Sequence, residues 1–242
     1  PRPRGWNLLR WLLGGREGQE PPRVAPQRIG RYRVIELLGE GGMGRVLLAE
    51  DDALRRRVAL KMLKREDESS QRRFLREARA AARVSHPNLC PIFEVGEAAG
   101  RPFLAMELLS GETLSARLRR GPLAPPEALD LAEDLLSALG ALHDAGVVHR
   151  DVKPSNLFLT PHGGKLVDFG LARELPGDVA RSVGTTTDLT SPGLIIGTPG
   201  YMAPEQILGQ GVDARADLFA AGIVLYEALT GRRPFPGDTA AA

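Results

Sequence analysis

The sequence predicts an α+β protein whose N-terminal part is rich in β-strands and whose C-terminal part is mainly helical. Three early segments have the length and the aliphatic, aromatic and β-branched content of strands: residues 31–39, 45–50 and 58–63. Longer segments carry apolar residues suited to helices: residues 69–84, 125–143 and 217–229. A chain of 242 residues is long enough to bury a hydrophobic core without disulfide bonds.

Composition excludes several classes of protein. Apolar residues make up 43% and charged residues 26% of the chain, which is typical of globular domains and excludes collagen and disordered proteins. Cys90 is the only cysteine, so a disulfide framework and a cysteine-ligated zinc site are excluded. The net charge is only +2, and we expect no nucleic-acid partner because that function needs basic residues gathered on one face.

Residues 1–29 are expected to form a flexible basic leader. They are rich in arginine, proline and glycine, with an apolar patch that begins at Trp6 and ends at Leu13. A helix lying on a membrane is the alternative for residues 6–13, because Trp and Leu beside Arg suit the headgroup interface. We expect membrane contact only through this patch or through a segment outside this sequence, because no apolar run approaches the roughly 20 residues of a membrane span.

The first two predicted strands flank a glycine-rich turn. Gly39, Gly41 and Gly44 have the spacing G-x-G-x-x-G, and Val46 follows them. Glycine lets backbone N–H groups approach phosphate oxygens because it has no Cβ atom. In a dinucleotide-binding fold this pattern opens a helix, whereas a strand follows it here, which argues against that fold.

A lysine and a glutamate stand among apolar residues in the next two elements. Lys61 interrupts the predicted strand 58–63, and Glu77 lies within the apolar set of the predicted helix 69–84. A buried lysine is unusual unless it is paired, so an ion pair between Lys61 and Glu77 is one interpretation. The alternative is that both side chains face solvent, as charged residues usually do.

The longest predicted helix, residues 125–143, carries an apolar stripe made of these residues: Leu129, Ala132, Leu135, Leu136, Leu139 and Leu142. Residues 217–229 are apolar on almost every side, which predicts that this helix is buried. This helix is expected to stop at Gly231.

Three short motifs follow one another in the C-terminal half. Residues 149–156 read His-Arg-Asp-Val-Lys-Pro-Ser-Asn, residues 168–170 read Asp-Phe-Gly, and residues 203–205 read Ala-Pro-Glu. Together with the glycine-rich turn, the strand lysine and the helix glutamate, they resemble the motifs of eukaryotic-type (Hanks-type) protein kinases in content and in order.

The resemblance implies the bilobal protein kinase fold, with a β-rich small lobe in residues 30–107 and a mainly helical large lobe in residues 108–242. The C-terminal helices that the family carries in its large lobe are missing from the sequence. Phe219 stands where the family has Trp, and Asp217 is expected to hydrogen-bond the backbone around His149. Larger bacterial members often continue into a linker, a membrane span and a sensor domain. We therefore expect a cytoplasmic kinase domain, with membrane anchoring of the full-length protein as an open alternative.

The resemblance also implies roles in the transfer of the γ-phosphoryl group of ATP, which depends mainly on positioning and charge stabilisation. Asp151 would accept the proton of the substrate hydroxyl, and Lys153 would stabilise the transferred phosphoryl group. Lys61 would contact the α- and β-phosphates, and Glu77 would hold Lys61 in place.

The ATP and Mg²⁺ sites follow from the same resemblance. Asn156 and Asp168 would hold Mg²⁺, because hard oxygen ligands suit that ion. Met106 would close the back of the adenine pocket, and adenine would bond backbone groups of Glu107 and Leu109. The other expected nucleotide contacts are Gly39, Glu40, Gly41, Gly42, Met43, Gly44, Val46, Ala59 and Lys61.

Residues 197–205 and Lys153 resemble serine/threonine kinases, most closely bacterial ones, so proteins with Ser or Thr acceptors are the expected substrates. Arg150 is expected to bind a phosphate on the loop 168–205, which would activate the enzyme by ordering this loop. The candidate acceptors in this loop are Ser182, Thr185, Thr186, Thr187, Thr190 and Ser191. Thr190 is favoured over residues 185–187, and a transient homodimer would let one copy phosphorylate another. The alternative is a polar loop without a modification.

Two other functions remain open. The expected catalytic positions are all occupied by the residue types that the family uses, which favours an active protein kinase. The missing helices favour a catalytically weak fragment, and a pseudokinase that binds nucleotide and acts as a scaffold is the related alternative.

Overall fold

The structure is a computed structural model and describes residues 28–41, 44–63, 68–168 and 199–235. Residues 1–27 of the predicted leader, Gly42, Met43 and the predicted phosphorylation sites in residues 182–191 lie outside the described residues. The last two residues of the predicted leader instead form strand β1 (Arg28–Ile29), which pairs with the first predicted strand. Within the described ranges, no helix is both long enough and apolar enough to cross a bilayer.

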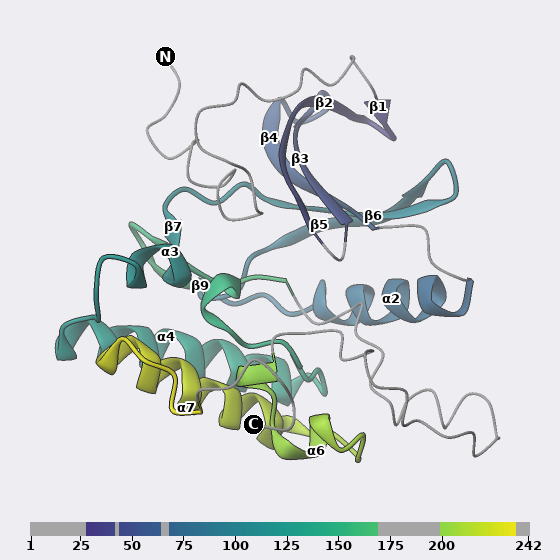
Figure 1. Cartoon of the computed structure of the whole chain (residues 1–242). Coiled ribbons are helices and arrows are strands. Elements are labelled where there is room, and N and C mark those ends of the chain that lie inside the picture. The colour runs from purple at the N-terminus through teal and green to yellow at the C-terminus, as the bar shows by residue number, and fades with distance from the viewer. Residues whose placement is uncertain (1–27, 42–43, 64–67, 169–198, 236–242) are drawn as a thin grey trace.

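A curled antiparallel sheet forms the upper part of the molecule, with helix α2 below it (Figure 1). The strands are β1 (Arg28–Ile29), β2 (Tyr32–Gly41), β3 (Gly44–Asp51), β4 (Arg56–Leu63), β5 (Ile92–Ala98) and β6 (Arg101–Glu107). They lie in the order β1-β2-β3-β4-β6-β5. Helix α2 (Glu68–Ala81) replaces the predicted helix 69–84 and ends three residues earlier. The three predicted strands are confirmed, each extended by one or more residues.

The inner side of this sheet is closed by apolar side chains from strands that are distant in sequence. Tyr32, Leu60 and Ala105 are fully buried in one cluster, and the ring of Tyr32 meets that of Phe103 edge-on with centroids 5.9 Å apart. Strand β4 pairs with β3 on one side and β6 on the other, so it lies in the middle of the sheet. Lys61 therefore starts from a buried central strand.

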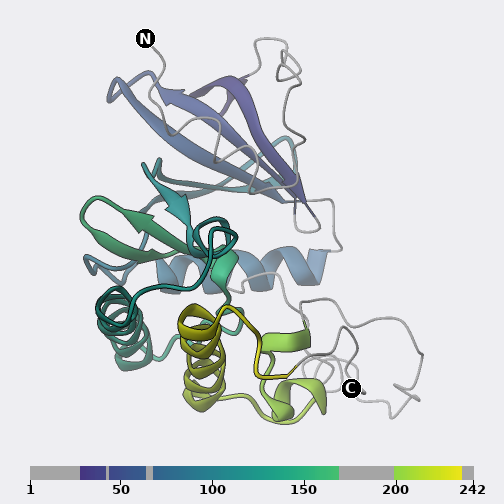
Figure 2. The ribbon, with the colours of Figure 1, turned by 60° about the vertical axis from the view of Figure 1, so that its left-hand side comes forward.

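The lower part of the molecule is built on two helices that lie side by side (Figures 1 and 2). These are α4 (Pro125–Asp144) and α7 (Ala214–Thr230), and α7 ends at Gly231, as predicted. A small sheet in the order β7-β8-β9 covers α4 on the side that faces the upper sheet. The remaining elements are β7 (Glu112–Thr113), α3 (Leu114–Leu118), η1 (Pro154–Asn156), β8 (Leu157–Thr160), β9 (Gly163–Leu166), η2 (Pro199–Tyr201) and α6 (Pro204–Ile207). The predicted α+β fold is confirmed.

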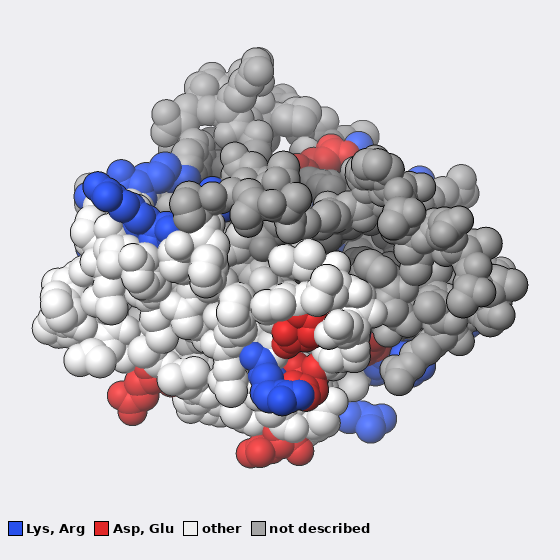
Figure 3. Space-filling view, turned by 60° about the horizontal axis from the view of Figure 1, so that its bottom comes forward, with Lys and Arg blue, Asp and Glu red and all other residues white. Residues whose placement is uncertain are grey.

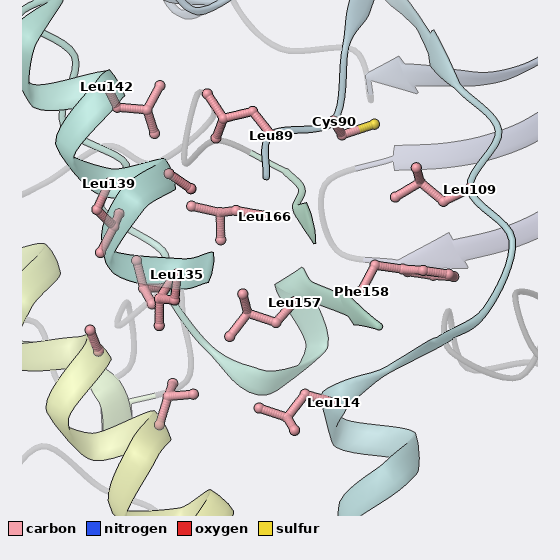
Figure 4. Close-up of a cluster of buried hydrophobic side chains, with 14 of the residues drawn as sticks. Leu89, Cys90, Leu109, Leu114, Leu135, Leu139, Leu142, Leu157, Phe158 and Leu166 are labelled. Carbon is pink, nitrogen blue, oxygen red and sulfur yellow. The ribbon is translucent and has the colours of Figure 1, made fainter. Parts of the chain in front are cut away.

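Leucines from α4, from residues 88–91 and from the small sheet pack together between these layers (Figure 4). Leu135, Leu139 and Leu142 are buried there, as the stripe predicts. Leu129 and Leu136 are not buried, since they are 70% and 45% exposed. The buried face of α4 instead includes Ala128, Leu131 and Ala138, which share one side of the helix with Leu135 and Leu142.

Helix α7 is buried on one side only, whereas its apolar sequence predicted a buried helix. Small residues such as Ala220, Ala221 and Val224 pack inward, whereas Leu218 and Leu229 are about half exposed. Figure 3 shows this lower face, on which charged side chains are sparse over the described part of the molecule. The apolar composition of this helix therefore did not predict which of its sides packs against other described elements.

Candidate functional site

The loop that follows α4 is fixed from below by a carboxylate of α7. Asp217 accepts hydrogen bonds from the backbone N–H groups of His149 at 2.8 Å and of Arg150 at 2.7 Å. Its Oδ2 also lies 2.8 Å from Nε2 of His143. Asp217 is almost fully buried, so these contacts replace the water that a buried carboxylate has lost. The predicted bond between Asp217 and the backbone around His149 is confirmed.

His149 is fully buried and ties the same loop to the segment after β9. Its Nε2 lies 3.2 Å from the carbonyl oxygen of Val167, and its Nδ1 accepts the N–H of Asp151 at 3.3 Å. Only a neutral imidazole with the proton on Nε2 satisfies both contacts. Burial lowers the pKa of His149, and the nearby Asp217 and Asp151 oppose that shift only in part.

Asp151 is buried and its carboxylate is held by two of the residues that the motif predicted. Lys153 places its Nζ 2.8 Å from Oδ2 of Asp151, and Asn156 donates from Nδ2 to the same oxygen at 3.0 Å. The same Nδ2 also donates to the backbone oxygen of Asp151 at 2.9 Å. Two donors on one oxygen fix the orientation of the carboxylate.

Lys61 reaches the other side of the site from the middle of the upper sheet. Its Nζ lies 2.9 Å from Oδ1 of Asp168, the residue that follows β9 by two positions. The predicted ion pair between Lys61 and Glu77 is therefore wrong for this structure. A buried ammonium needs a carboxylate close by, and the end of β9 brings Asp168 to it.

Glu77 instead lies beside two guanidinium groups. Its Oε1 is 3.9 Å from Arg150 NH1 and 4.0 Å from Arg76 NH2. Helix α2 thus places Glu77 beside the loop that contains Asp151, whereas Lys61 pairs with Asp168.

Asn156 and Asp168 are joined through the backbone, because the N–H of Val167 donates to the carbonyl oxygen of Asn156 at 2.9 Å. The bonds that Asn156 donates from Nδ2 orient its side-chain amide, with Oδ1 as the atom available to a cation. An amide oxygen and a carboxylate are ligands that Mg²⁺ accepts, usually together with water and phosphate oxygens. The described residues contain no cluster of three or more His, Cys, Asp or Glu that could hold a metal by itself. The pair fits an ion that is shared with a phosphate ligand.

Most of the residues predicted to line the adenine site lie on β3, β4 and β6. Ala59 pairs with Met106 across β4 and β6, and Val46 pairs with Lys61 across β3 and β4. Ala59, Met106 and Leu109 belong to one buried apolar cluster, and Val46 packs against it. The structure therefore brings the predicted apolar walls together on one side of Lys61.

The described part of the glycine-rich turn is the tip of the hairpin β2–β3. Gly39 pairs with Val46, Glu40 with Arg45, and Gly41 with Gly44. The carboxylate of Glu40 lies 3.0 Å from the guanidinium of Arg45, so its side chain is engaged within the hairpin.

Two residues of this region were not predicted from the motifs. Lys165 on β9 lies 3.1 Å from the carboxylate of Glu107, which is the last residue of β6. Gln206 donates from Nε2 to the carbonyl oxygen of Arg150 at 3.0 Å and so ties α6 to the catalytic loop. Neither contact has a local sequence signal, because each joins residues more than 50 positions apart.

Residues 32–242 match the family model described as a protein kinase domain. The chain is 43% identical over 229 residues to the serine/threonine-protein kinase PknA of Mycobacterium tuberculosis, which covers 90% of this chain and 51% of that protein. It is 41% identical over 215 residues to the serine/threonine-protein kinase pkn2 of Myxococcus xanthus, which covers 86% of this chain and 25% of that protein. The chain thus spans between about a quarter and a half of the length of these curated relatives.

The fold is shared with a solved structure. The crystal structure of the PknI kinase domain of Mycobacterium tuberculosis matches with a TM-score of 0.71 and 29% identity, over 88% of this chain and 79% of that chain. The match to the family model, the identity to the curated kinases and this structural similarity agree with the order of the motifs along the chain. This chain therefore belongs to the protein kinase family.

Proposed function

We propose that the chain is a serine/threonine protein kinase that transfers the γ-phosphoryl group of ATP to Ser or Thr hydroxyls of proteins. The observation that carries this proposal is the environment of Asp151. Its buried carboxylate is held by Lys153 and by Asn156, and both of these contacts involve Oδ2. A carboxylate oriented in this way can accept the proton of a hydroxyl that is placed against it.

Each of the other site residues has a matching task. Lys61 supplies a positive charge for the phosphates of ATP, and Lys153 supplies one beside the transferred group. Asn156 and Asp168 would hold Mg²⁺, which neutralises phosphate charge when it is bound. Ala59, Met106 and the backbone after β6 would receive the adenine ring. These assignments agree with the expectation that ATP and Mg²⁺ are the cofactors.

Control by phosphorylation is the second part of the proposal. Arg150 and Arg76 both lie within 4.0 Å of Oε1 of Glu77, so two guanidinium groups converge on one carboxylate oxygen. A phosphate on the loop 168–205 would be a stronger partner for Arg150 than this carboxylate, because it carries more charge and three acceptor oxygens. Glu77 would then be released toward Lys61. We expect Thr190 to be the acceptor, with residues 185–187 as the rival.

The alternative function is a catalytically weak fragment or a nucleotide-binding scaffold. It is favoured by one observation, because Lys61 pairs with Asp168 and not with Glu77. In that arrangement the charge of Lys61 is directed at a carboxylate that the proposed reaction needs for Mg²⁺.

Incubation of the purified chain with Mg-ATP, followed by intact-mass measurement, separates these functions. An active kinase gains about 80 Da per phosphate, the mass of one added phosphoryl group, and an Asp151→Ala chain treated in the same way gains none. Peptide mapping then locates the phosphate at Thr190 or at residues 185–187. A parent chain that binds Mg-ADP but never gains mass would support the scaffold.

A further inference from the structure

An ion pair joins the last residue of β6 to the strand that leads into Asp168. Nζ of Lys165 lies 3.1 Å from Oε2 of Glu107, and the two side chains are 18% and 39% exposed. Glu107 lies where the adenine ring is expected to bond the backbone, whereas Lys165 lies on β9, three residues before Asp168. The pair therefore connects the two ends of the proposed nucleotide site.

Backbone hydrogen bonds through residues 88–91 also connect β6 to β9. The N–H of Glu107 donates to the carbonyl oxygen of Pro91 at 3.0 Å, and the N–H of Cys90 donates to the carbonyl oxygen of Leu166 at 3.0 Å. The N–H of Leu166 returns a bond to the carbonyl oxygen of Asn88 at 2.8 Å. Residues 88–91 thus lie between β6 and β9 and are bonded to both.

Cys90 lies in this connecting segment and is buried, as are Leu89 and Leu166 (Figure 4). Its Sγ lies 3.7 Å from the carbonyl oxygen of Glu107. Burial raises the pKa of the thiol to about 12, with a further contribution from the carboxylate of Glu107. Cys90 is therefore neutral at physiological pH and adds no charge beside the ion pair of Glu107 and Lys165.

The segment 88–91 and strand β9 are also bonded to helix α4. Asn88 donates from Nδ2 to Asp134 of α4 at 2.7 Å and to the carbonyl oxygen of Gly164 at 3.0 Å. The N–H of Gly164 also donates to Asp134. Asn88 and Asp134 thus bond β9 to α4, so the ion pair joins Glu107 to a strand that is itself bonded to this helix.

We propose that Lys165 is a positioning residue for nucleotide binding, which fixes the position of the adenine-binding backbone at Glu107 relative to Asp168. This inference rests on the nucleotide site proposed above. A ligand that contacts both ends of the site binds more tightly when their relative position is fixed, because binding then costs less conformational entropy. A ligand that touches only the adenine end does not depend on where Asp168 lies.

The test compares two ligands by calorimetric titration of the parent chain and of a Lys165→Met chain. Mg-ADP reaches both ends of the site, whereas adenosine carries no phosphate and reaches only the adenine end. We expect Lys165→Met to weaken Mg-ADP by about fivefold, the scale of one partly exposed ion pair. Adenosine should change by less than about twofold, which is within the effect of a distant surface charge.

Three further variants separate positioning from a general loss of structure. Lys165→Arg retains the charge and should recover most of the affinity for Mg-ADP. Glu107→Gln should match Lys165→Met, and the double variant should lose no more than either single variant, because both remove one interaction. Arg33→Gln is the matched control, since Arg33 on β2 pairs with Glu50 on β3 and with Asp52, which follows β3. It should leave both affinities unchanged.

The affinities for Mg-ADP and adenosine distinguish a failure of the positioning role from a failure of the nucleotide site. Equal losses for Mg-ADP and adenosine, or no loss for either, would overturn the role of Lys165 while leaving the nucleotide site intact. A parent chain that binds neither ligand would overturn the proposed nucleotide site and the positioning role together. A selective loss for Mg-ADP that Lys165→Arg restores would support the inference.

Discussion

The ammonium of Lys61 lies 2.9 Å from a carboxylate oxygen of Asp168. Lys61 belongs to the central strand β4 of the upper sheet, and Asp168 follows strand β9 of the lower part. The ion pair therefore crosses between the two parts of the molecule at the position where the phosphates of ATP are expected. The ammonium of Lys61 is buried and the carboxylate of Asp168 is partly exposed, so removal of Asp168 would leave a buried charge without compensation.

Replacing Lys61 tests the role of its positive charge in phosphoryl transfer. Lys61→Met should lower the rate of phosphoryl transfer at least about 100-fold, because the phosphates lose a preorganised positive charge. Lys61→Arg should recover little of that rate, since a planar guanidinium does not replace a compact ammonium. Initial rates with radiolabelled ATP measure both effects. Arg101→Met, at the exposed start of β6, is the control that should retain the parent rate.

Asp217 should be among the most sensitive positions for stability. Asp217→Asn replaces a buried carboxylate that meets His149 N–H, Arg150 N–H and His143. The expected loss is about 3 kcal/mol in the free energy of unfolding, because hydrogen bonds to a buried charge are replaced by weaker or mismatched ones. Urea denaturation measures it. Asp213→Asn, which changes only the exposed N-cap of α7, should cost less than about 1 kcal/mol. Equal losses for the two variants would refute the role given to Asp217.

Two glycines of the same helix should respond to alanine in opposite directions. Gly231 caps α7 with a φ of +70°, a left-handed conformation in which a side chain is strained. Gly231→Ala should therefore destabilise the fold by about 1 kcal/mol. Gly222 lies within α7 and an added Cβ there meets no atom within 4 Å, so Gly222→Ala should stabilise by about 0.5–1 kcal/mol. Thermal unfolding of both variants checks the sign of each change.

Stability should increase with pH between about 5 and 7 because of His149. Burial lowers the pKa of His149 in the folded state below its ordinary value near 6.5, so the unfolded chain binds the proton more readily. The stabilisation is complete above the unfolded pKa and is lost as the pH falls below it. One such group contributes a slope of at most about 1.4 kcal/mol per pH unit. His149→Phe should flatten the dependence measured by urea denaturation at several pH values, and His162→Ala, at an exposed site, should not. An unchanged slope in His149→Phe would contradict this assignment.

The elements with strong local signals were predictable from the sequence. The glycine-rich turn lies between β2 and β3, and α4 starts at Pro125, where proline is well suited to the first turn of a helix. The catalytic loop was predictable too, because Asp151, Lys153 and Asn156 lie within six consecutive residues and meet through local contacts. In such segments, sequence separation and spatial separation are both small.

The features that failed depend on how distant elements pack. The partner of Lys61 was not predictable, because the rotation and position of α2 decide whether Glu77 reaches β4 or Arg150. Leu129 was expected in the core because it is apolar, yet it faces outward, while Leu131 on the other side of the helix is buried. The contact between Lys165 and Glu107 joins residues that are 58 positions apart. No pattern within either segment indicates the other.

The most direct test of the proposed activity is phosphoamino-acid analysis of an acceptor protein, β-casein, after incubation with the chain and Mg-[γ-³²P]ATP. The account predicts phosphoserine and phosphothreonine with the parent chain and neither with Asp151→Asn, which keeps the shape of the side chain but cannot accept a proton as a carboxylate does. Both chains should still bind Mg-ADP. Absence of label with a parent chain that binds Mg-ADP, or equal label with Asp151→Asn, would contradict the assignment of this chain as an active serine/threonine kinase.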